Sequence, residues 1–429
     1  MRERTTTTLP NRETTLTVLL CRLLLLPVLF AAGVTLPACG ESTLEPTIPL
    51  GTPVSLSTQT PVATVIMDTS GASSGAGAAG GILVSTGGTI GSQAPEFAGI
   101  SSWINSDPLT LADLRGEVVL VDFWTYTCVN CVRTFPYLKE WNEKYADLGL
   151  TIVGVHSPEF EFEEVRENVV RSSEDHGLIY PIAQDNDFDT WRAYKNLAWP
   201  SKYLIDAAGI VRYAHFGEGG YVETERQIRQ LLSDIGADVT RVNVGTDPGP
   251  SMDFRARSID QELRLTSEIY AGFERNLFSG PYIEQGNYFL GPDEVRTYED
   301  PGAHFNNFLY LQGDWLNSKE YLVHGRETRA YEDYVALKAS AISVNVVIDP
   351  EVAESFDVQV TIDGRPLRQN EAGFDIIVED ARSFFVVNEA RMYRILELPA
   401  YGTHELKLSS NSTGFAIFAF TFGGYPEGP

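Results

Sequence analysis

The sequence predicts two folded domains in series, an α/β domain followed by an all-β antiparallel sandwich. Two continuous apolar runs, 118–124 and 150–155, are typical of strands that are buried on both faces, and a helical pattern follows each run. Beyond residue 236 the pattern changes to short segments of alternating apolar and polar residues, as in 341–348 and 356–362. A chain of 429 residues is long enough to bury a core in each domain.

The α/β domain is expected over residues 93–236. Besides the two apolar strands, its pattern contains three helical segments and two shorter strands. We expect the helices at 132–145, 162–173 and 222–235 and the strands at 203–205 and 210–215.

The all-β domain is expected over residues 255–425, after a linker at 237–254. The segment 414–422 is a further alternating strand of this domain. Asp363 and Gly364 tolerate positive φ, so they predict a tight hairpin turn. The natural fold for such a pattern is an antiparallel sandwich of the jelly-roll kind.

The first residues are expected to direct export. The apolar run 23–36 is shorter than a membrane span but is typical of a signal peptide. It ends in Leu36-Pro-Ala-Cys39, which resembles a bacterial lipobox, so we expect 1–38 to be a lipoprotein signal peptide and Cys39 to carry the lipid. Plain cleavage and an uncleaved anchor remain alternatives, because Pro37 is unusual in a lipobox.

The following segment, 39–92, is dominated by Thr, Ser, Gly, Pro and Ala. Because it has few large side chains to bury, we expect a flexible tether. The protein is therefore expected outside the cytoplasm, lipid-anchored to the outer face of the cytoplasmic membrane. The formal charge of −26 would repel phosphate backbones, so nucleic acid is not an expected partner.

Four cysteines occur, and two of them, Cys21 and Cys39, lie in the export segment or directly after it. The remaining pair, Cys128 and Cys131, lies where a strand is expected to lead into a helix. Unpaired N–H groups at a helix N-terminus favour a thiolate, so Cys128 is expected to be the nucleophile and Cys131 the resolving thiol. A zinc site and a purely structural disulfide are the alternatives, but no further Cys or His stands at zinc-ligand spacing. We expect no metal and no cofactor beyond the redox-active disulfide.

The sequence around this pair resembles the thioredoxin superfamily. The resemblance implies that Asp122 is a buried acid that exchanges protons with the resolving thiol. It implies that Trp124 is a packing aromatic and Pro136 a proline that kinks the active-site helix. It also implies that Pro200 is a cis-proline facing the disulfide, so that Trp199, Pro200 and Trp124 would contribute to substrate docking.

More narrowly, the chain resembles the extracytoplasmic part of DipZ-type disulfide-interchange proteins. In that family a β-sandwich module similar to carbohydrate-binding modules follows the thioredoxin-like domain, so a glycan ligand is an expectation. Such proteins also carry an electron-conducting membrane domain, which implies here a separate membrane electron-transfer protein of the CcdA or DsbD type. The motifs that carry the resemblance are 125–131, 155–160, 185–187, 212–220, 267–273, 313–315 and 417–423.

Several weaker signals also have simpler explanations. The acidic run 185–189 has the spacing of a calcium loop without its Gly and terminal Glu, so a solvated turn is favoured. His156 and Glu159 are candidates for proton movement or docking, with a satisfied loop histidine as the favoured interpretation. A sugar-stacking platform and core packing both explain the aromatic residues Tyr310, Trp315, Tyr321, Tyr331 and Tyr334.

The function expected from these features is thiol-disulfide exchange on exported proteins, with the chain acting as the reductant. The alternative of a different class is a lipid-anchored binding protein for glycan or protein, in which the thioredoxin-like fold is only a scaffold. A thiol peroxidase is a less favoured enzyme, because Thr125-x-x-Cys128 lacks the proline that precedes a peroxidatic cysteine motif.

Overall fold

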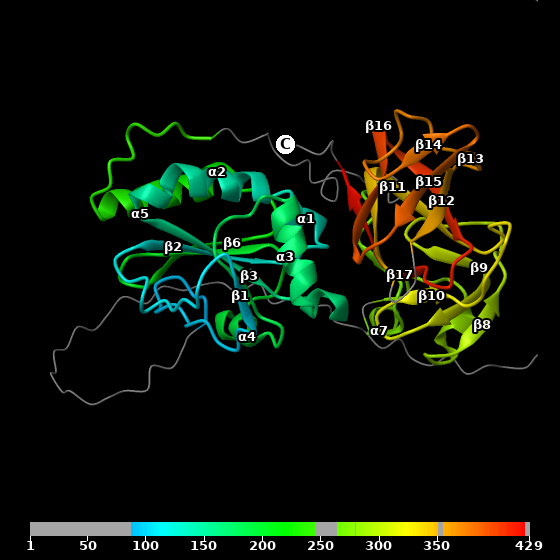
Figure 1. The fold of residues 1–429 in the computed structure, drawn as a ribbon, viewed down its shortest axis with the longest axis horizontal. Coiled ribbons are helices and arrows are strands. Elements are labelled where there is room, and N and C mark those ends of the chain that lie inside the picture. Colours follow the sequence, from blue (N-terminus) through cyan, green and yellow to red (C-terminus); the bar gives the residue numbers. More distant parts are fainter. Residues whose placement is uncertain (1–86, 246–263, 279, 351–354, 425–429) are drawn as a thin grey trace, which may run out of the picture. The chain divides into compact units, whose positions relative to one another are not determined.

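The computed structural model describes residues 87–245, 264–278, 280–350 and 355–424. The expected signal peptide, the Cys39 that is expected to carry a lipid, nearly all of the expected tether and part of the expected linker lie outside these residues. The described residues form a mixed α/β sheet domain followed by an antiparallel β domain, which confirms the predicted fold class (Figure 1). Among the helices in these ranges, none has both the length and the apolar character needed to cross a membrane.

The first domain is built on a six-stranded sheet with the order β1-β4-β3-β2-β5-β6. Strand β2 pairs in parallel with β3 and antiparallel with β5, and it is buried along its whole length, which accounts for its continuous apolar sequence. The strands are β1 Ser102–Ile104, β2 Val118–Trp124, β3 Leu150–His156, β4 Ile182–Gln184, β5 Ser201–Ile205 and β6 Val211–Phe216.

Helices cover both faces of this sheet. Figure 1 shows α2 and α5 on one face and α4 on the other. Alternate residues of β2 pack on the two sides, Leu120 with the apolar faces of α2 and α5 and Val121 with Tyr194 of α4. The helices are α1 Val129–Val132, α2 Phe135–Tyr145, α3 Arg166–Asp175, α4 Asp189–Tyr194 and α5 Tyr221–Asp234, with the 3₁₀ turns η1 Ala146–Leu148 and η2 Glu161–Glu164.

The active-site helix differs from its predicted form. The expected helix at 132–145 begins at Val129 and is divided into α1 and α2. Pro136 stands in the first turn of α2, where its missing N–H leaves no helical hydrogen bond unmade. The proline therefore helps to start a second helix after a break in the first. The short elements β1, β4 and α4 were not predicted, because three to six residues are too few to show a period.

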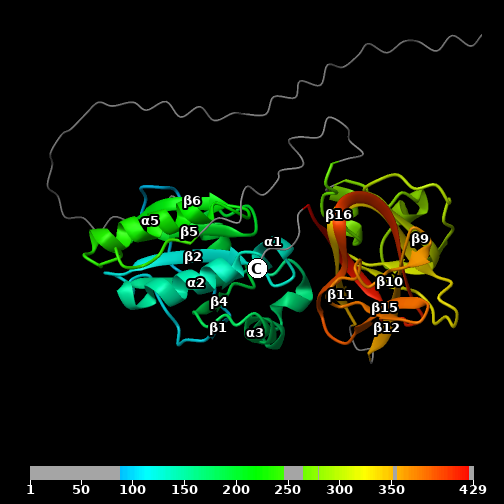
Figure 2. The ribbon, with the colours of Figure 1, turned by 90° about the horizontal axis from the view of Figure 1, so that it is seen from above.

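The second domain is an eleven-stranded antiparallel sheet. Its two longest strands are β11 and β16, which pair with each other along both halves of β11. On its other edge, the first half of β11 pairs with β9 and the second half pairs with β17. Figure 2 shows β16 as a strongly curved strand. The strands are β7 Ile269–Tyr270, β8 Val295–Tyr298, β9 Leu309–Asn317, β10 Leu322–His324, β11 Tyr334–Asp349, β12 Phe356–Ile362, β13 Arg365–Pro366, β14 Ile377–Glu379, β15 Arg382–Val387, β16 Arg391–Ser410 and β17 Ala416–Gly423, with helix α7 Phe273–Phe278 and the 3₁₀ turn η4 Gly286–Leu290.

The predicted hairpin turn at Asp363 and Gly364 is confirmed. It connects β12 to β13 with Ile362 opposite Arg365, and its two residues have φ values of 48° and 75°. Positive φ at both central positions matches the right-handed twist of the paired strands.

Candidate active site

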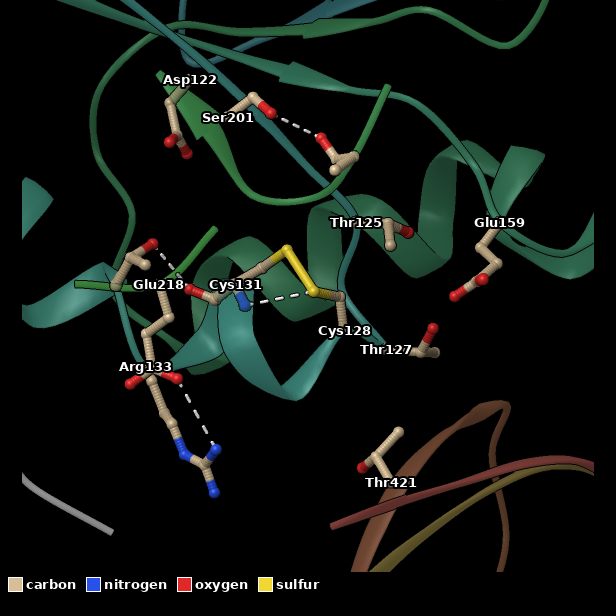
Figure 3. The surroundings of a disulfide bond; sticks show 12 residues. Asp122, Thr125, Thr127, Cys128, Cys131, Arg133, Glu159, Ser201, Glu218 and Thr421 are labelled. Carbon is tan, nitrogen blue, oxygen red and sulfur yellow. Dashed lines mark hydrogen bonds and ion pairs between the residues drawn. A yellow bond between two sulfur atoms is a disulfide. The ribbon is translucent and has the colours of Figure 1, made fainter. Parts of the chain in front are cut away.

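Cys128 and Cys131 form a disulfide in the turn between β2 and α1, with their Cα atoms 5.2 Å apart (Figure 3). Cys128 is the N-cap of α1, and its sulfur accepts a hydrogen bond from the backbone N–H of Cys131 at 3.2 Å. Cys131 is completely buried, whereas Cys128 is partly exposed. The two sulfur atoms therefore differ both in access and in the N–H groups that face them.

The peptide bond between Trp199 and Pro200 is cis and directly precedes β5. Pro200 is buried, and its carbonyl accepts a hydrogen bond from the backbone N–H of Gly217 at 2.8 Å. Trp199 is half-buried and its ring lies 4.4 Å from that of Trp191. The indole of Trp199 thus keeps an accessible part next to the cis bond.

Trp124 does not take part in an accessible docking surface. It is completely buried as the last residue of β2, with Phe135 and His156 packed against its ring at centroid distances of 5.2 and 4.9 Å. A Cβ at Gly154 would stand 2.9 Å from the indole nitrogen, so a glycine on the neighbouring strand leaves room for the ring. This burial agrees with the implied packing role, whereas the docking role stays a prediction without an exposed indole surface to support it.

Asp122 and Lys202 form an ion pair inside the sheet. They are directly opposite each other on β2 and β5, with Lys202 Nζ 3.2 Å from Asp122 Oδ1, and both side chains are completely buried. Burial raises the pKa of Asp122 from its ordinary value, although the nearby charge of Lys202 opposes the rise. The carboxyl group therefore keeps its proton to a higher pH than an exposed aspartate does.

Sequence reasoning did not identify Lys202. A lysine directly before the predicted apolar strand 203–205, two residues after the proline implied to be cis, was the available signal. The role of this lysine becomes clear only from the register of β2 with β5, which places Asp122 opposite Lys202. Burying a lone ammonium group is costly, so a buried lysine indicates a nearby anion.

His156 ends β3 and lies beneath the cysteine turn rather than in a loop. Its Nε2 atom is 3.5 Å from Thr125 Oγ1, its ring stacks on that of Tyr126, and its Nδ1 atom has no hydrogen-bond partner among the described residues. Burial lowers the pKa of His156 to about 3, so the imidazole is neutral at physiological pH. The favoured interpretation, a satisfied loop histidine, is therefore wrong.

Glu163 was also missed, since two other acids, Glu161 and Glu164, stand beside it in 161–164. In the structure it is completely buried. One carboxylate oxygen accepts hydrogen bonds from the hydroxyl and the backbone N–H of Thr127, at 2.6 and 3.2 Å. The other accepts from the backbone N–H groups of Glu159 and Phe160, at 2.5 and 3.2 Å. Burial raises the pKa of Glu163 to about 7, partly offset by the hydrogen bond from Thr127.

Glu159 does not contact the cysteines through any hydrogen bond found among the described residues. Its carboxylate accepts a hydrogen bond from the hydroxyl of Tyr270 at 2.7 Å and lies 3.2 Å from the guanidinium of Arg275. Burial raises its pKa, with Arg275 opposing the rise. The residue is thus held by partners of its own.

The calcium-like run at 185–189 is a helix cap. The buried carboxylate of Asp185 accepts hydrogen bonds from the backbone N–H groups of Thr190 and Trp191, at 3.0 and 2.8 Å. These bonds satisfy the first turn of α4. Within the described ranges, no group of three or more His, Cys, Asp or Glu side chains is placed to hold a metal ion.

The five aromatic residues considered as a sugar platform do not form a common surface. Tyr310 and Trp315 are completely buried in the β domain, and Trp315 belongs to its core. Tyr334 donates a hydrogen bond to Asp300 at 2.6 Å and is covered by the ammonium group of Lys407. Core packing therefore explains Trp315, and complete burial removes Tyr310 from any exposed platform.

Comparisons with known proteins agree with this geometry. Residues 90–214 match the AhpC/TSA family and residues 266–423 match the thioredoxin like C-terminal domain. The chain is 39% identical over 225 residues to protein DipZ of Mycobacterium bovis, which covers 52% of this chain and 30% of DipZ. It therefore spans about a third of the length of the DipZ proteins it matches.

Two smaller relatives match the redox domain. Thiol-disulfide oxidoreductase ResA of Geobacillus thermodenitrificans is 32% identical over 146 residues, which cover 34% of this chain and 78% of ResA. Thiol-disulfide oxidoreductase YkuV of Bacillus subtilis is 29% identical over 141 residues, which cover 33% of this chain and 94% of YkuV. With its CxxC disulfide at the start of a helix and these relatives, the chain belongs to the thiol-disulfide oxidoreductase family of the thioredoxin superfamily.

Proposed function

We propose that this enzyme reduces disulfides of exported proteins outside the cytoplasm, with Cys128 as the attacking thiol and Cys131 as the resolving thiol. The observation that carries the proposal is the difference between the two sulfur atoms. Cys128 is partly exposed at the N-cap of α1 and accepts a backbone N–H, whereas Cys131 is completely buried. An accessible sulfur with N–H stabilisation suits attack, and a buried one suits internal resolution.

In the reduced enzyme the Cys128 thiolate attacks one sulfur of a substrate disulfide. A bond forms between Cys128 and that sulfur, and the other substrate sulfur leaves as a thiolate. The Cys131 thiolate then attacks Cys128, which forms the intramolecular disulfide and releases the second substrate thiolate. Two electrons have passed from the enzyme to the substrate, and the enzyme is left oxidised.

The resolving step requires loss of the Cys131 proton, and Asp122 is the proposed acceptor. Its carboxyl is buried next to Lys202, which steadies the anion when the proton is lost. The cis bond at Pro200 and the accessible part of Trp199 are the proposed docking points for an extended substrate chain.

The direction of electron flow is proposed from the charges near Cys128. A strong oxidant stabilises its thiolate with a cation close to the first sulfur, but Val129 and Asn130 supply none. The nearby Arg133 is mostly buried, and its guanidinium lies 3.7 Å from the carboxylate of Glu218 (Figure 3). We expect a reduction potential nearer to roughly −270 mV than to roughly −120 mV. Equilibration with glutathione or dithiothreitol buffers measures it, and a value above about −150 mV would make the protein an oxidase.

A reductant outside the cytoplasm needs a supply of electrons. The proposed donor is a dithiol on a separate membrane electron-transfer protein of the CcdA or DsbD type, which would reduce the Cys128–Cys131 disulfide by the reverse exchange. Attachment through a lipid on Cys39 would hold the enzyme near that donor. Cys39→Ser should release the protein from membranes, and unchanged membrane attachment without an acyl group would disprove the anchor.

A further inference from the structure

The mechanism above gives no task to Glu163, which is a completely buried acid. Its carboxylate is held by the hydroxyl and the N–H of Thr127, and Thr127 is covalently bonded to Cys128. Figure 3 shows Thr127 on the side of the disulfide that faces away from Asp122. The two buried acids therefore lie on different sides of the site, and Glu163 is attached to the turn that carries Cys128.

The hydrogen bonds of Glu163 suit a carboxylate anion. Three backbone N–H groups, from Thr127, Glu159 and Phe160, and the hydroxyl of Thr127 all donate to its two oxygens. N–H groups cannot accept a hydrogen bond, so the three backbone partners favour the charged form. Burial acts in the opposite direction and raises the pKa of Glu163 to about 7. The charge is thus present in a large share of molecules at neutral pH.

The other titratable groups that face Glu163 do not neutralise it. His156 is neutral because burial lowers its pKa to about 3, and Tyr126 is neutral because burial raises its pKa. The carboxylate of Glu159 adds repulsion, but it has partners of its own in Tyr270 and Arg275. Neither His156, Tyr126 nor Glu159 supplies a positive charge, so none of these three groups compensates the negative charge of Glu163.

We propose that Glu163 is a positioning residue that sets the acidity of the Cys128 thiol, and through it the reduction potential of the enzyme. A buried negative charge beside the cysteine turn disfavours a second negative charge on Cys128. The thiolate is destabilised relative to the disulfide, so the enzyme becomes a better reductant. The proposal rests on the proposed role of Cys128 as the attacking thiol.

The test compares two substitutions in the full-length protein. Glu163→Gln removes the charge while the amide oxygen can still accept from Thr127. Glu161→Gln is the matched control, because Glu161 stands on the same 3₁₀ turn but is exposed. The pH dependence of alkylation gives the pKa of Cys128 in each reduced protein, and glutathione equilibration above that pKa gives the potential.

For Glu163→Gln we expect the Cys128 pKa to fall by about one unit. The equilibrium with glutathione should then shift about tenfold toward the reduced enzyme, which corresponds to a potential about 30 mV more positive. The control should match the wild-type protein in both measurements. A Glu163→Gln protein that loses stability but keeps the wild-type pKa and potential would show a purely structural role and overturn the proposal.

A second measurement does not depend on how the variant folds. Coupling between two groups is reciprocal, so a Cys128 thiolate must raise the pKa of Glu163 as much as Glu163 raises that of Cys128. Carboxyl ¹³C shifts of wild-type protein should therefore give a Glu163 pKa about one unit higher with Cys128 as thiolate than in the disulfide form. Equal values in the two forms would overturn the proposal. Alkylation of wild-type Cys131 before Cys128 would instead contradict the proposed function itself.

Discussion

The two domains bury ionisable side chains in opposite ways. In the α/β domain, burial dominates: it raises the pKa of Asp122 and of Glu163 and lowers that of His156. In the β domain, burial also acts to raise the pKa of Asp333, but hydrogen bonds from Arg326 and His324 outweigh it and the pKa is lowered. Burial thus sets the direction of these pKa shifts in the α/β domain, whereas hydrogen bonds reverse its effect on the pKa of Asp333 in the β domain.

The difference separates groups that can exchange a proton from groups that hold a fold together. His324 lies between Asp333 and the carbonyl of Ser412, 3.0 Å from each, so its two ring nitrogens are engaged. His156 has one ring nitrogen without a partner among the described residues and the other at 3.5 Å from a hydroxyl. Incompletely satisfied buried groups destabilise a protein and persist where they have a functional task. Several such groups in the described residues, among them Asp122, His156 and Lys202, belong to the sheet that carries the cysteine turn.

The largest expected effect is on activity and concerns the cysteines. Cys128→Ser should reduce disulfide exchange to the uncatalysed background, since the attacking sulfur is lost. Cys131→Ala should leave an attacking thiol that cannot be resolved, so mixed disulfides with partner proteins accumulate. An insulin reduction assay and non-reducing gel electrophoresis measure the two outcomes, and trapped partners on the Cys128→Ser protein would reverse the roles.

The next effect concerns the buried ion pair. Lys202→Met should lower the free energy of unfolding by about 3–5 kcal/mol at pH 8, because it leaves the charge of Asp122 buried and unpaired. Adding Asp122→Asn should restore most of the loss, because the double variant has no buried charge at this position. Urea unfolding of the single and double variants measures both. Equal losses in the two proteins would mean that the lysine acts through packing alone.

The domains should also respond to pH in opposite directions. The pKa of Glu163 is raised from its ordinary 4.5 to about 7, so its contribution to stability is fully present below pH 4.5 and is lost as the pH rises through 7. This loss should lower the free energy of unfolding of the α/β domain by about 3 kcal/mol. The lowered pKa of Asp333 gives a contribution that is present above its ordinary 3.8 and is lost as the pH falls below that value.

Hydrogen exchange measured separately on peptides from β2 and β11 checks these opposite slopes. Protection of β2 should decrease between pH 5 and pH 8 after correction for the intrinsic exchange rate, and Glu163→Gln should flatten the decrease. Parallel slopes in the two strands would contradict the comparison.

The smallest effect is expected in the β domain. Asp333→Asn weakens the hydrogen bonds to His324 and Arg326, and it should cost about 2 kcal/mol of unfolding free energy. The reduction potential and the Cys128 pKa should not change, since Asp333 and its partners belong to the β domain and Cys128 belongs to the α/β domain. A shift in potential as large as that expected for Glu163→Gln would show that buried charge in the β domain also tunes the redox site.

Features of the fold that depend on local pattern could be predicted from the amino-acid sequence. The continuous apolar run became the central strand β2, the alternating runs became β11 and β12, and Asp363-Gly364 became a hairpin turn. The CxxC spacing at a strand end favoured a redox pair, because a helix start presents N–H groups to whichever side chain precedes it. The zinc and structural alternatives lost weight only through the scattered histidines and the resemblance of the surrounding residues to the thioredoxin superfamily.

Which charged residues belong to the site depends on contacts that form only in the folded protein. Lys202 acquires its partner from the register of β2 with β5, and Glu163 reaches Thr127 across 36 residues of chain. Nothing in the local sequence distinguishes Glu163 from its exposed neighbours Glu161 and Glu164, because all three are acids on one short turn. Burial and long-range pairing set the pKa of a group, and both arise from contacts between segments that are distant in the sequence.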